Sequence, residues 1–123
     1  MSMRILIADD SLFWREELRA ILEQGSDFIV FEARDGLEAV RESSRVHPDV
    51  VILDLRMPLL DGLGAARQLK RATPTLPVLI VTVDKTAFLE ATARQAGVSA
   101  VFSKTECMDL RNFLHRTLLA HAA

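Results

Sequence analysis

Residues with reactive or metal-binding side chains stand at the ends of four short apolar runs in the sequence. Asp9 and Asp10 follow residues 4–8, Asp54 follows residues 50–53, Thr82 ends residues 77–82, and Lys104 comes shortly after residues 100–102. Apolar runs of this length, bounded by turn residues, are typical of strands that are buried on both faces of a parallel sheet. Because ligands of open α/β sheets bind beyond the carboxyl ends of the strands, we expect these side chains to gather at one edge.

Three carboxylates that meet at one edge repel one another and raise one another's pKa unless a cation lies between them. Mg²⁺ suits such a site because it commonly takes one or two carboxylates together with phosphate oxygens. A hydroxyl at Thr82 and an ammonium at Lys104 complete a set of groups that favours transfer of a phosphoryl group to a carboxylate. Each residue alone has an ordinary structural explanation, so this prediction rests on all the positions together.

The rest of the chain predicts the elements that position these residues. Strands are expected over residues 4–8, 28–33, 50–54, 77–82 and 100–102, and helices after Asp10 or Ser11, after Asp35-Gly36, after Asp61-Gly62, over residues 86–96, and around Leu110 to Thr117. Strict alternation of strands and helices predicts an α/β fold with a doubly wound, five-stranded parallel sheet between two helical layers. The expected strand order is 2-1-3-4-5, a flavodoxin-like (βα)5 three-layer sandwich whose switch point lies between the first and third strands.

Helical spacing also predicts which side chains face the core. In the first helix the apolar stripe includes Leu22, and Arg15 falls on the opposite, solvent side. In the second helix we expect Leu37 to point inward. The fourth helix is rich in alanine and has only Phe88 and Leu89 as large apolar residues, so its buried stripe should be thin.

The composition predicts one globular domain over residues 1–123. The net charge of −2, from 17 acidic and 15 basic residues, argues against a nucleic-acid-binding surface made by this domain. The single cysteine, Cys107, has no partner for an internal disulfide, so we expect a cytoplasmic protein. We expect neither a signal peptide nor a membrane span, since no run approaches the roughly 20 apolar residues that cross a bilayer.

At these residues the sequence resembles the response-regulator receiver domains of two-component signalling, over essentially the whole of residues 4–119. The motifs that carry the resemblance are Asp9-Asp10, Asp54 followed by Met57-Pro58 and Asp61-Gly62, Thr82, and Phe102 with Lys104. The resemblance implies a signalling domain that assists its own phosphorylation and dephosphorylation and is not a metabolic enzyme. Its expected partners are a sensor histidine kinase or a phosphotransfer protein.

The resemblance also implies a role for each site residue. Asp54 would accept the phosphoryl group in a Mg²⁺-dependent reaction. Asp10, Asp54 and the backbone carbonyl of Arg56 would bind Mg²⁺ directly, and Asp9 would act largely through water. Lys104 would contact the phosphoryl group.

A switch is implied as well, formed by Thr82 and Phe102. Thr82 would swing toward the phosphoryl group, and Phe102 would rotate inward into the space that Thr82 leaves. The pair would alter the surface made by the fourth helix, the fifth strand and the fifth helix, and so control an output domain, a target protein or a homodimer.

The sequence departs from the usual receiver pattern around the site. Thr105 follows Lys104 where many receivers have a proline in a cis peptide, and whether this bond is cis or trans is left open. Val83 replaces the usual alanine or glycine after the switch threonine, so we expect it to crowd the entrance and slow phosphorylation. Arg56 and Asp84 carry opposite charges at positions that tune phosphoryl lifetime in this family, and pairing or independent solvation are both open.

Three other functions were weighed against a phosphorylated receiver. A pseudo-receiver, which uses the same fold as a constitutive interaction module, is supported by Val83 and by the missing proline. A haloacid-dehalogenase-type phosphatase needs a second aspartate two residues after the nucleophile, where this chain has Arg56. A flavin carrier is disfavoured because the first loop has no cradle rich in glycine and hydroxyls. Whether the receiver stands alone or belongs to a longer protein is left open.

Overall fold

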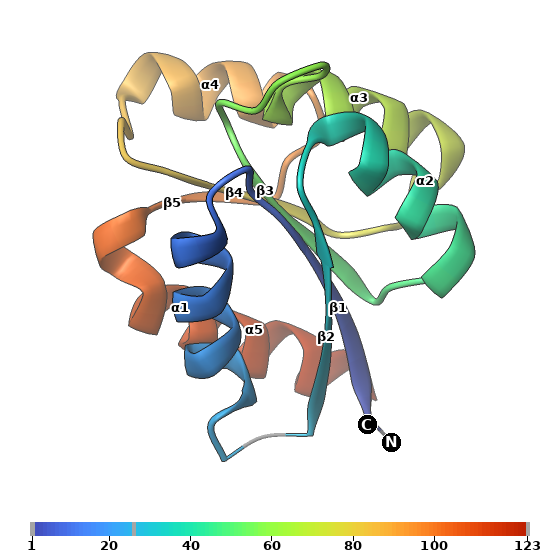
Figure 1. The fold of residues 1–123 in the computed structure, drawn as a ribbon, viewed down its shortest axis with the longest axis vertical. Coiled ribbons are helices and arrows are strands. Elements are labelled where there is room, and N and C mark those ends of the chain that lie inside the picture. The colour runs from blue at the N-terminus through green and yellow to red at the C-terminus, as the bar shows by residue number, and fades with distance from the viewer. Residues whose placement is uncertain (1, 26, 123) are drawn as a thin grey trace.

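The computed structural model describes residues 2–25 and 27–122, with side chains described as far as residue 117. Five parallel strands form one sheet in the order β2-β1-β3-β4-β5, as the sequence predicts (Figure 1). The strands are β1 (Met3–Ala8), β2 (Phe28–Ala33), β3 (Val50–Asp54), β4 (Val78–Thr82) and β5 (Ala100–Ser103). The helices are α1 (Leu12–Glu23), α2 (Gly36–Val46), α3 (Gly62–Ala72), α4 (Ala87–Gln95) and α5 (Cys107–Ala122), with a 3₁₀ turn, η1 (Lys104–Glu106), before α5.

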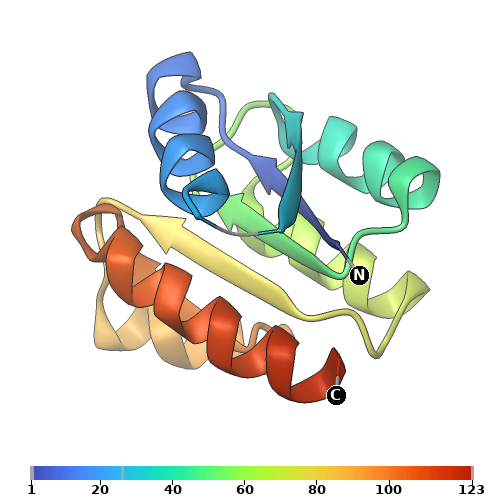
Figure 2. The ribbon, with the colours of Figure 1, turned by 90° about the horizontal axis from the view of Figure 1, so that it is seen from below.

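Helices cover both faces of the sheet (Figures 1 and 2). The helices α1 and α5 lie on one face, and α2, α3 and α4 lie on the other. Two apolar cores lie on the two faces of the sheet, and alternate residues of β1 belong to each. Ile5 and Ile7 belong to the core that includes Leu22 of α1, while Leu6 belongs to the core that includes Leu69 of α3. Every residue of β3 and β4 is buried. Because both faces of these central strands lie in the core, each strand has four consecutive apolar residues before its last, polar residue.

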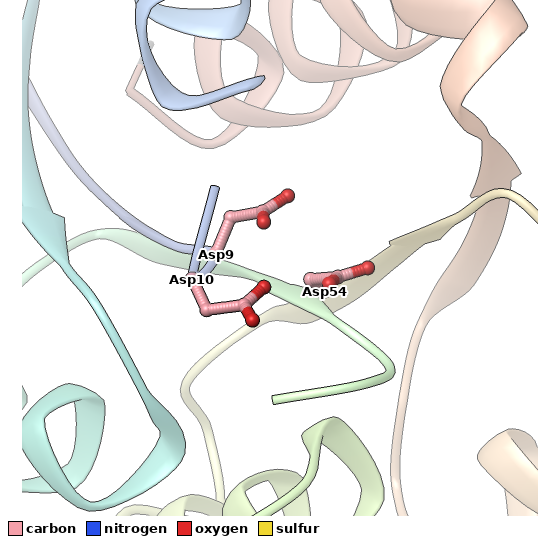
Figure 3. A group of neighbouring side chains, drawn as sticks. All are labelled: Asp9, Asp10 and Asp54. Atoms are coloured by element: carbon pink, nitrogen blue, oxygen red, sulfur yellow. The ribbon is translucent and has the colours of Figure 1, made fainter. Parts of the chain in front are cut away.

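The helices begin at the caps that the sequence predicts. The side chain of Ser11 accepts a hydrogen bond from the backbone N–H of Trp14, and Asp61 accepts one from Gly64 in the same way. Of the two candidates for the first cap, the structure uses Ser11. The carboxylate of Asp10 is therefore not used as the cap and points toward the sheet edge (Figure 3).

Two predictions of side-chain exposure were wrong. Arg15 is only 9% exposed, because its guanidinium group binds Glu32 on β2 and the backbone of the loop after β1. Leu37 is 44% exposed, whereas the thin buried stripe predicted for α4 is confirmed, since Leu89 is buried and Phe88 is 82% exposed. In both helices small residues occupy the inner face together with a few larger ones, since α2 buries Ala39 and α4 buries Ala93.

Strand order brings the chemically useful residues to one end of the sheet. Because β1 and β3 pair in parallel with Ala8 opposite Leu53, the residues that follow them are neighbours. β4 and β5 continue the same edge, with Thr82 opposite Ser103. Within the described part of the chain, no helix has the length and apolar character needed to cross a membrane.

Gly62 keeps the start of α3 close to the acceptor strand. Its N–H donates to the carbonyl oxygen of Leu55 at 2.8 Å, and a Cβ at this position would collide with the backbone carbonyl of Asp54. We predict that Gly62→Ala lowers the free energy of unfolding in urea by about 1–3 kcal/mol, because backbone atoms must move.

The matched control is Gly64→Ala, two residues further along the same helix. An added Cβ there meets the flexible end of the Leu60 side chain. Its effect should stay within about 1 kcal/mol, the scale of the helix propensity difference between glycine and alanine. Equal losses of stability in the two variants would contradict the close approach at Gly62.

Candidate functional site

Three carboxylates converge at the carboxyl ends of β1 and β3, as predicted. Asp9 and Asp10 directly follow β1, and Asp54 is the last residue of β3. Each offers one oxygen, and these oxygens lie within 4.8 Å of one another (Figure 3). Asp9 and Asp54 are each 8% exposed, whereas Asp10 lies at the surface. The site is therefore a half-open pocket that holds two buried carboxylates.

Lys104 supplies the positive charge inside this pocket. Its Nζ lies 2.7 Å from Oδ2 of Asp9 and 3.6 Å from Oδ1 of Asp54, and its side chain is only 9% exposed. All peptide bonds of the described residues are trans, the bond between Lys104 and Thr105 included. The lysine therefore reaches both carboxylates without the cis proline that many receivers have.

A capping turn fixes the backbone of Lys104. The Ser103 hydroxyl accepts from the N–H of Thr105 at 3.2 Å, and the Glu106 carboxylate accepts from the N–H of Ser103 at 2.8 Å. Glu106 is also paired with Lys85 at 3.2 Å. This reciprocal arrangement is a capping box, and it begins η1 at Lys104.

Burial and charge repulsion act on Asp54 in the same direction. Burial, followed by the nearby charge of Asp9, raises the pKa of the Asp54 carboxyl to about 6. Lys104 opposes this change but does not cancel it. The pocket thus has more negative charge than one lysine balances, which is the condition that favours a bound cation.

Arg15 binds the backbone of the loop that carries Asp9. The sequence did not predict this contact. Its Nη1 donates to the backbone carbonyl of Asp9 at 2.7 Å, and its Nε donates to Glu32 on β2 at 2.9 Å. Arg19 donates to the second oxygen of Glu32 at 2.7 Å. Glu32 could have indicated this contact, because a carboxylate within an otherwise apolar strand needs a positively charged partner.

Thr82 and Phe102 lie on the strands beside the acceptor. Thr82 ends β4, is 1% exposed, and its hydroxyl oxygen accepts from the N–H of Asp84 at 3.2 Å. Phe102, on β5, is half-buried and packs edge-on against Phe113 of α5, with ring centroids 5.6 Å apart. The structure thus places both residues where the sequence expects them, and their switching role stays a prediction.

Charged and apolar side chains form the rim of the pocket. Nη2 of Arg56 lies 3.6 Å from Oδ2 of Asp84, with side chains 75% and 63% exposed. The opposite charges therefore do pair, and at this exposure the pair contributes only about 0–1 kcal/mol. Val83 is 61% exposed, and its effect on access to the pocket stays a prediction.

The fold and the pocket match a known family. The sequence profile of the response regulator receiver domain matches residues 5–115, and the chain belongs to this family. Among curated relatives, protein-glutamate methylesterase/protein-glutamine glutaminase 3 of Hahella chejuensis is 39% identical over 107 residues, which cover 85% of this chain and 30% of that protein. A corresponding protein of Methanosarcina acetivorans is 40% identical over 90 residues, which cover 72% of this chain and 26% of that protein. The chain thus spans less than a third of the length of these relatives.

Solved structures give the same result. The response regulator domain of Thermotoga maritima CheB superposes with a TM-score of 0.86 at 26% identity, over 94% of this chain and 96% of that one. A LuxR-family two-component response regulator from an Aurantimonas species superposes with a TM-score of 0.90 at 28% identity, over 98% of this chain and 87% of that one. The resemblance inferred from the sequence motifs is confirmed.

The raised pKa of Asp54 predicts a stability that depends on pH. The carboxyl binds its proton more tightly in the folded protein, where its pKa is about 6, than in the unfolded chain, where it is near 3.8. The resulting destabilisation is absent below about pH 4, grows as the pH rises to about 6, and is complete above that value. We therefore predict that Asp54→Asn, in EDTA at pH 7.5, raises the free energy of unfolding by about 2–3 kcal/mol.

Urea unfolding at two pH values tests this prediction. At pH 4 the advantage of Asp54→Asn should shrink to less than about 1 kcal/mol, because the wild-type carboxyl is then largely protonated in the folded state. Asp61→Asn is the control, since Asp61 caps α3 outside the acidic cluster. An advantage of Asp54→Asn that is the same at both pH values would contradict the electrostatic origin.

Proposed function

We propose that this chain is a phosphorylated receiver: Asp54 accepts a phosphoryl group from a sensor histidine kinase or a phosphotransfer protein in the cytoplasm. The observation that carries the proposal is the position of Asp54. It is a buried carboxylate at the end of the central strand, beside two further carboxylates and within 3.6 Å of the Lys104 ammonium. Nucleophile, counter-charge and acidic partners are thus assembled before any phosphoryl group arrives.

The acidic cluster fits Mg²⁺ as the cofactor. Asp9, Asp10 and Asp54 offer oxygens close enough to share one ion. The pKa of Asp54 is raised first by burial and then by the charge of Asp9, which a divalent cation would offset. We propose that these residues and the backbone carbonyl of Arg56 hold the ion, with Asp9 acting largely through water. When bound, Mg²⁺ would offset charge on the transferred group.

The chain's own residues carry the transfer. An ionised oxygen of Asp54 attacks phosphorus, an O–P bond forms, and the P–N bond to the imidazole of the donor histidine breaks, with the electron pair leaving on nitrogen. Lys104 contacts the incoming phosphoryl oxygens, because its ammonium already lies beside Asp54. Thr82 then turns its hydroxyl toward the phosphoryl group, and Phe102 moves inward behind it.

The output follows from this switch. Phe102 belongs to β5, which lies between α4 and α5, so its movement would change the surface that these three elements form. We propose that this surface regulates an output domain or a target protein, directly or through a homodimer. Because two relatives carry the name protein-glutamate methylesterase, an esterase is one candidate for the regulated output.

A pseudo-receiver remains the second candidate function. The observation in its favour is Val83, an exposed valine that follows the switch threonine at the rim of the pocket. The missing cis proline gives the pseudo-receiver little support, because Lys104 reaches both buried carboxylates from a trans peptide.

Phosphorylation by a small donor tests the proposed function. Acetyl phosphate with Mg²⁺ should add one phosphoryl group to the wild-type protein, as measured by mass spectrometry of the intact chain. EDTA should abolish the addition. Asp54→Asn should abolish it as well, because the amide is not a nucleophile for this step.

A control variant and two contrary outcomes complete this phosphorylation experiment. Asp49→Asn, which removes a carboxylate at the opposite end of β3, should leave the reaction unchanged. A protein that neither binds Mg²⁺ nor gains a phosphoryl group would support the pseudo-receiver. Mg²⁺ binding without phosphorylation would indicate that Val83 or Lys104 closes the site to phosphoryl donors.

The rim ion pair should influence how long the phosphoryl group lasts. We predict that Arg56→Gln and Asp84→Asn each change the dephosphorylation rate, and that their effects are not additive, because each removes the same contact. At the exposure of this pair the coupling should correspond to no more than about a five-fold change in rate. A coupling of zero in the double-mutant cycle would show that the two charges act independently.

A further inference from the structure

The indole of Trp14 is a third partner of the Lys104 ammonium. Nζ of Lys104 lies 4.9 Å from the centroid of the Trp14 ring, while the same atom contacts Asp9 and Asp54. A cation over the face of an aromatic ring is attracted by the negative face of the π system, and tryptophan is the strongest partner. The lysine is therefore held by two buried carboxylates and one indole.

The start of α1 fixes the position of this indole. The N–H of Trp14 donates to the Ser11 hydroxyl at 3.3 Å, so the residue lies in the first turn directly after the acidic loop. Phe13 contacts the indole edge-on, with centroids 5.3 Å apart. One helix cap thus sets both the acidic loop and the ring that faces Lys104.

A small cavity lies beside this contact. Trp14, Lys104, Asp9, Asp54 and Cys107 are among the residues that line it, and its volume of about 20 Å³ is enough for about one water molecule. The indole therefore borders the acceptor site itself and can influence the reaction through Lys104.

We propose that Trp14 is a positioning residue for Lys104, and that it keeps the ammonium oriented and poorly hydrated while charge moves from Asp54 to the phosphoryl group. The inference rests on the proposed function of Asp54 as acceptor. Lysine has a flexible stem and rotates freely, so an ammonium guided by charges alone stays with the nearer carboxylate. In this pocket the nearer carboxylate is that of Asp9, at 2.7 Å against 3.6 Å for Asp54.

The need for a neutral partner appears during transfer. Once Asp54 becomes an acyl phosphate, its carboxylate charge is lost and the negative charge lies on the phosphoryl oxygens. The attraction of Lys104 therefore has to shift from the carboxylate of Asp54 to the phosphoryl oxygens, while the carboxylate of Asp9 keeps its charge and competes for the ammonium. The indole keeps the same charge before and after transfer, so its contact with the ammonium persists through the step.

Substitutions of Trp14 test the proposal by distinguishing the effect of an aromatic π face from the effect of side-chain volume. Trp14→Leu keeps an apolar side chain without a π face, and Trp14→Phe keeps a π face. With acetyl phosphate and Mg²⁺, we expect phosphorylation to be about 10-fold slower in Trp14→Leu and within about 3-fold of wild type in Trp14→Phe. Leu12→Ala, the matched control in the same helical turn, changes an exposed side chain and should react like the wild type.

Two results of this series would overturn the proposal. Equal rates for Trp14→Leu and Trp14→Phe would mean that the residue only fills space. A wild-type rate in both would mean that Lys104 needs no aromatic partner. Urea unfolding of each variant shows whether it is folded, and if Trp14→Leu does not fold, Trp14→Met provides a second side chain without a π face.

Fluorescence tests the contact without any phosphorylation. Trp14 is the sole tryptophan of the sequence, so its emission reports on this pocket alone. In EDTA, Lys104→Met should change the intensity or the maximum of this emission, because it removes the charge over the ring, whereas Lys70→Met, at a lysine whose ammonium donates to the carbonyls of Pro74 and Leu76, should not. Unchanged emission in Lys104→Met overturns the proposal. A changed emission in a protein that acetyl phosphate never labels would support the contact and show that the proposed function of Asp54 is what failed.

Discussion

Repulsion among buried carboxylates is the constraint on which the rest of this structure depends. Two of the three acidic side chains are almost fully buried, and this burial, followed by the nearby charge of Asp9, raises the pKa of Asp54 to about 6. Such an arrangement persists because the strands that carry it are fixed from both faces of the sheet by two separate apolar cores. The fold therefore supplies the free energy that holds like charges together, and the repulsion among them favours the binding of a cation.

The positive charges that balance this cluster are held by different means. Lys104 enters the pocket from a capped turn, and its side chain lies between carboxylates and an indole. Arg15 is fixed to Glu32 on β2 and binds the backbone of the acidic loop, so it fixes the position of Asp9 without occupying the pocket. One cation thus lies inside the pocket beside the carboxylates, and the other holds the backbone of the loop that carries Asp9.

The buried interior and the exposed surroundings of the site differ in how firmly they are held. The ends of the central strands fix the positions of Asp54 and its acidic partners, whereas the side chains of Arg56, Val83 and Asp84 are exposed. The helix α4 buries only Leu89 and Ala93, a thin stripe of the kind expected of an element of low local stability. A thin buried stripe next to β5 fits the proposal that these elements pass a local charge change on to a surface.

The sequence by itself determined the strand order and the convergence of Asp9, Asp10 and Asp54, because these follow from hydrophobic periodicity, turn residues and the handedness of parallel crossovers. It left the first helix cap open between Asp10 and Ser11, and the structure uses Ser11. The tertiary structure alone decided how charges and rings meet across elements distant in sequence. Arg15 was predicted to face solvent because helical spacing records only apolar side chains, and its burial depends on Glu32 of a neighbouring strand. The contact between Lys104 and Trp14 joins residues 90 positions apart, and only the docking of α1 beside the start of α5 brings them together.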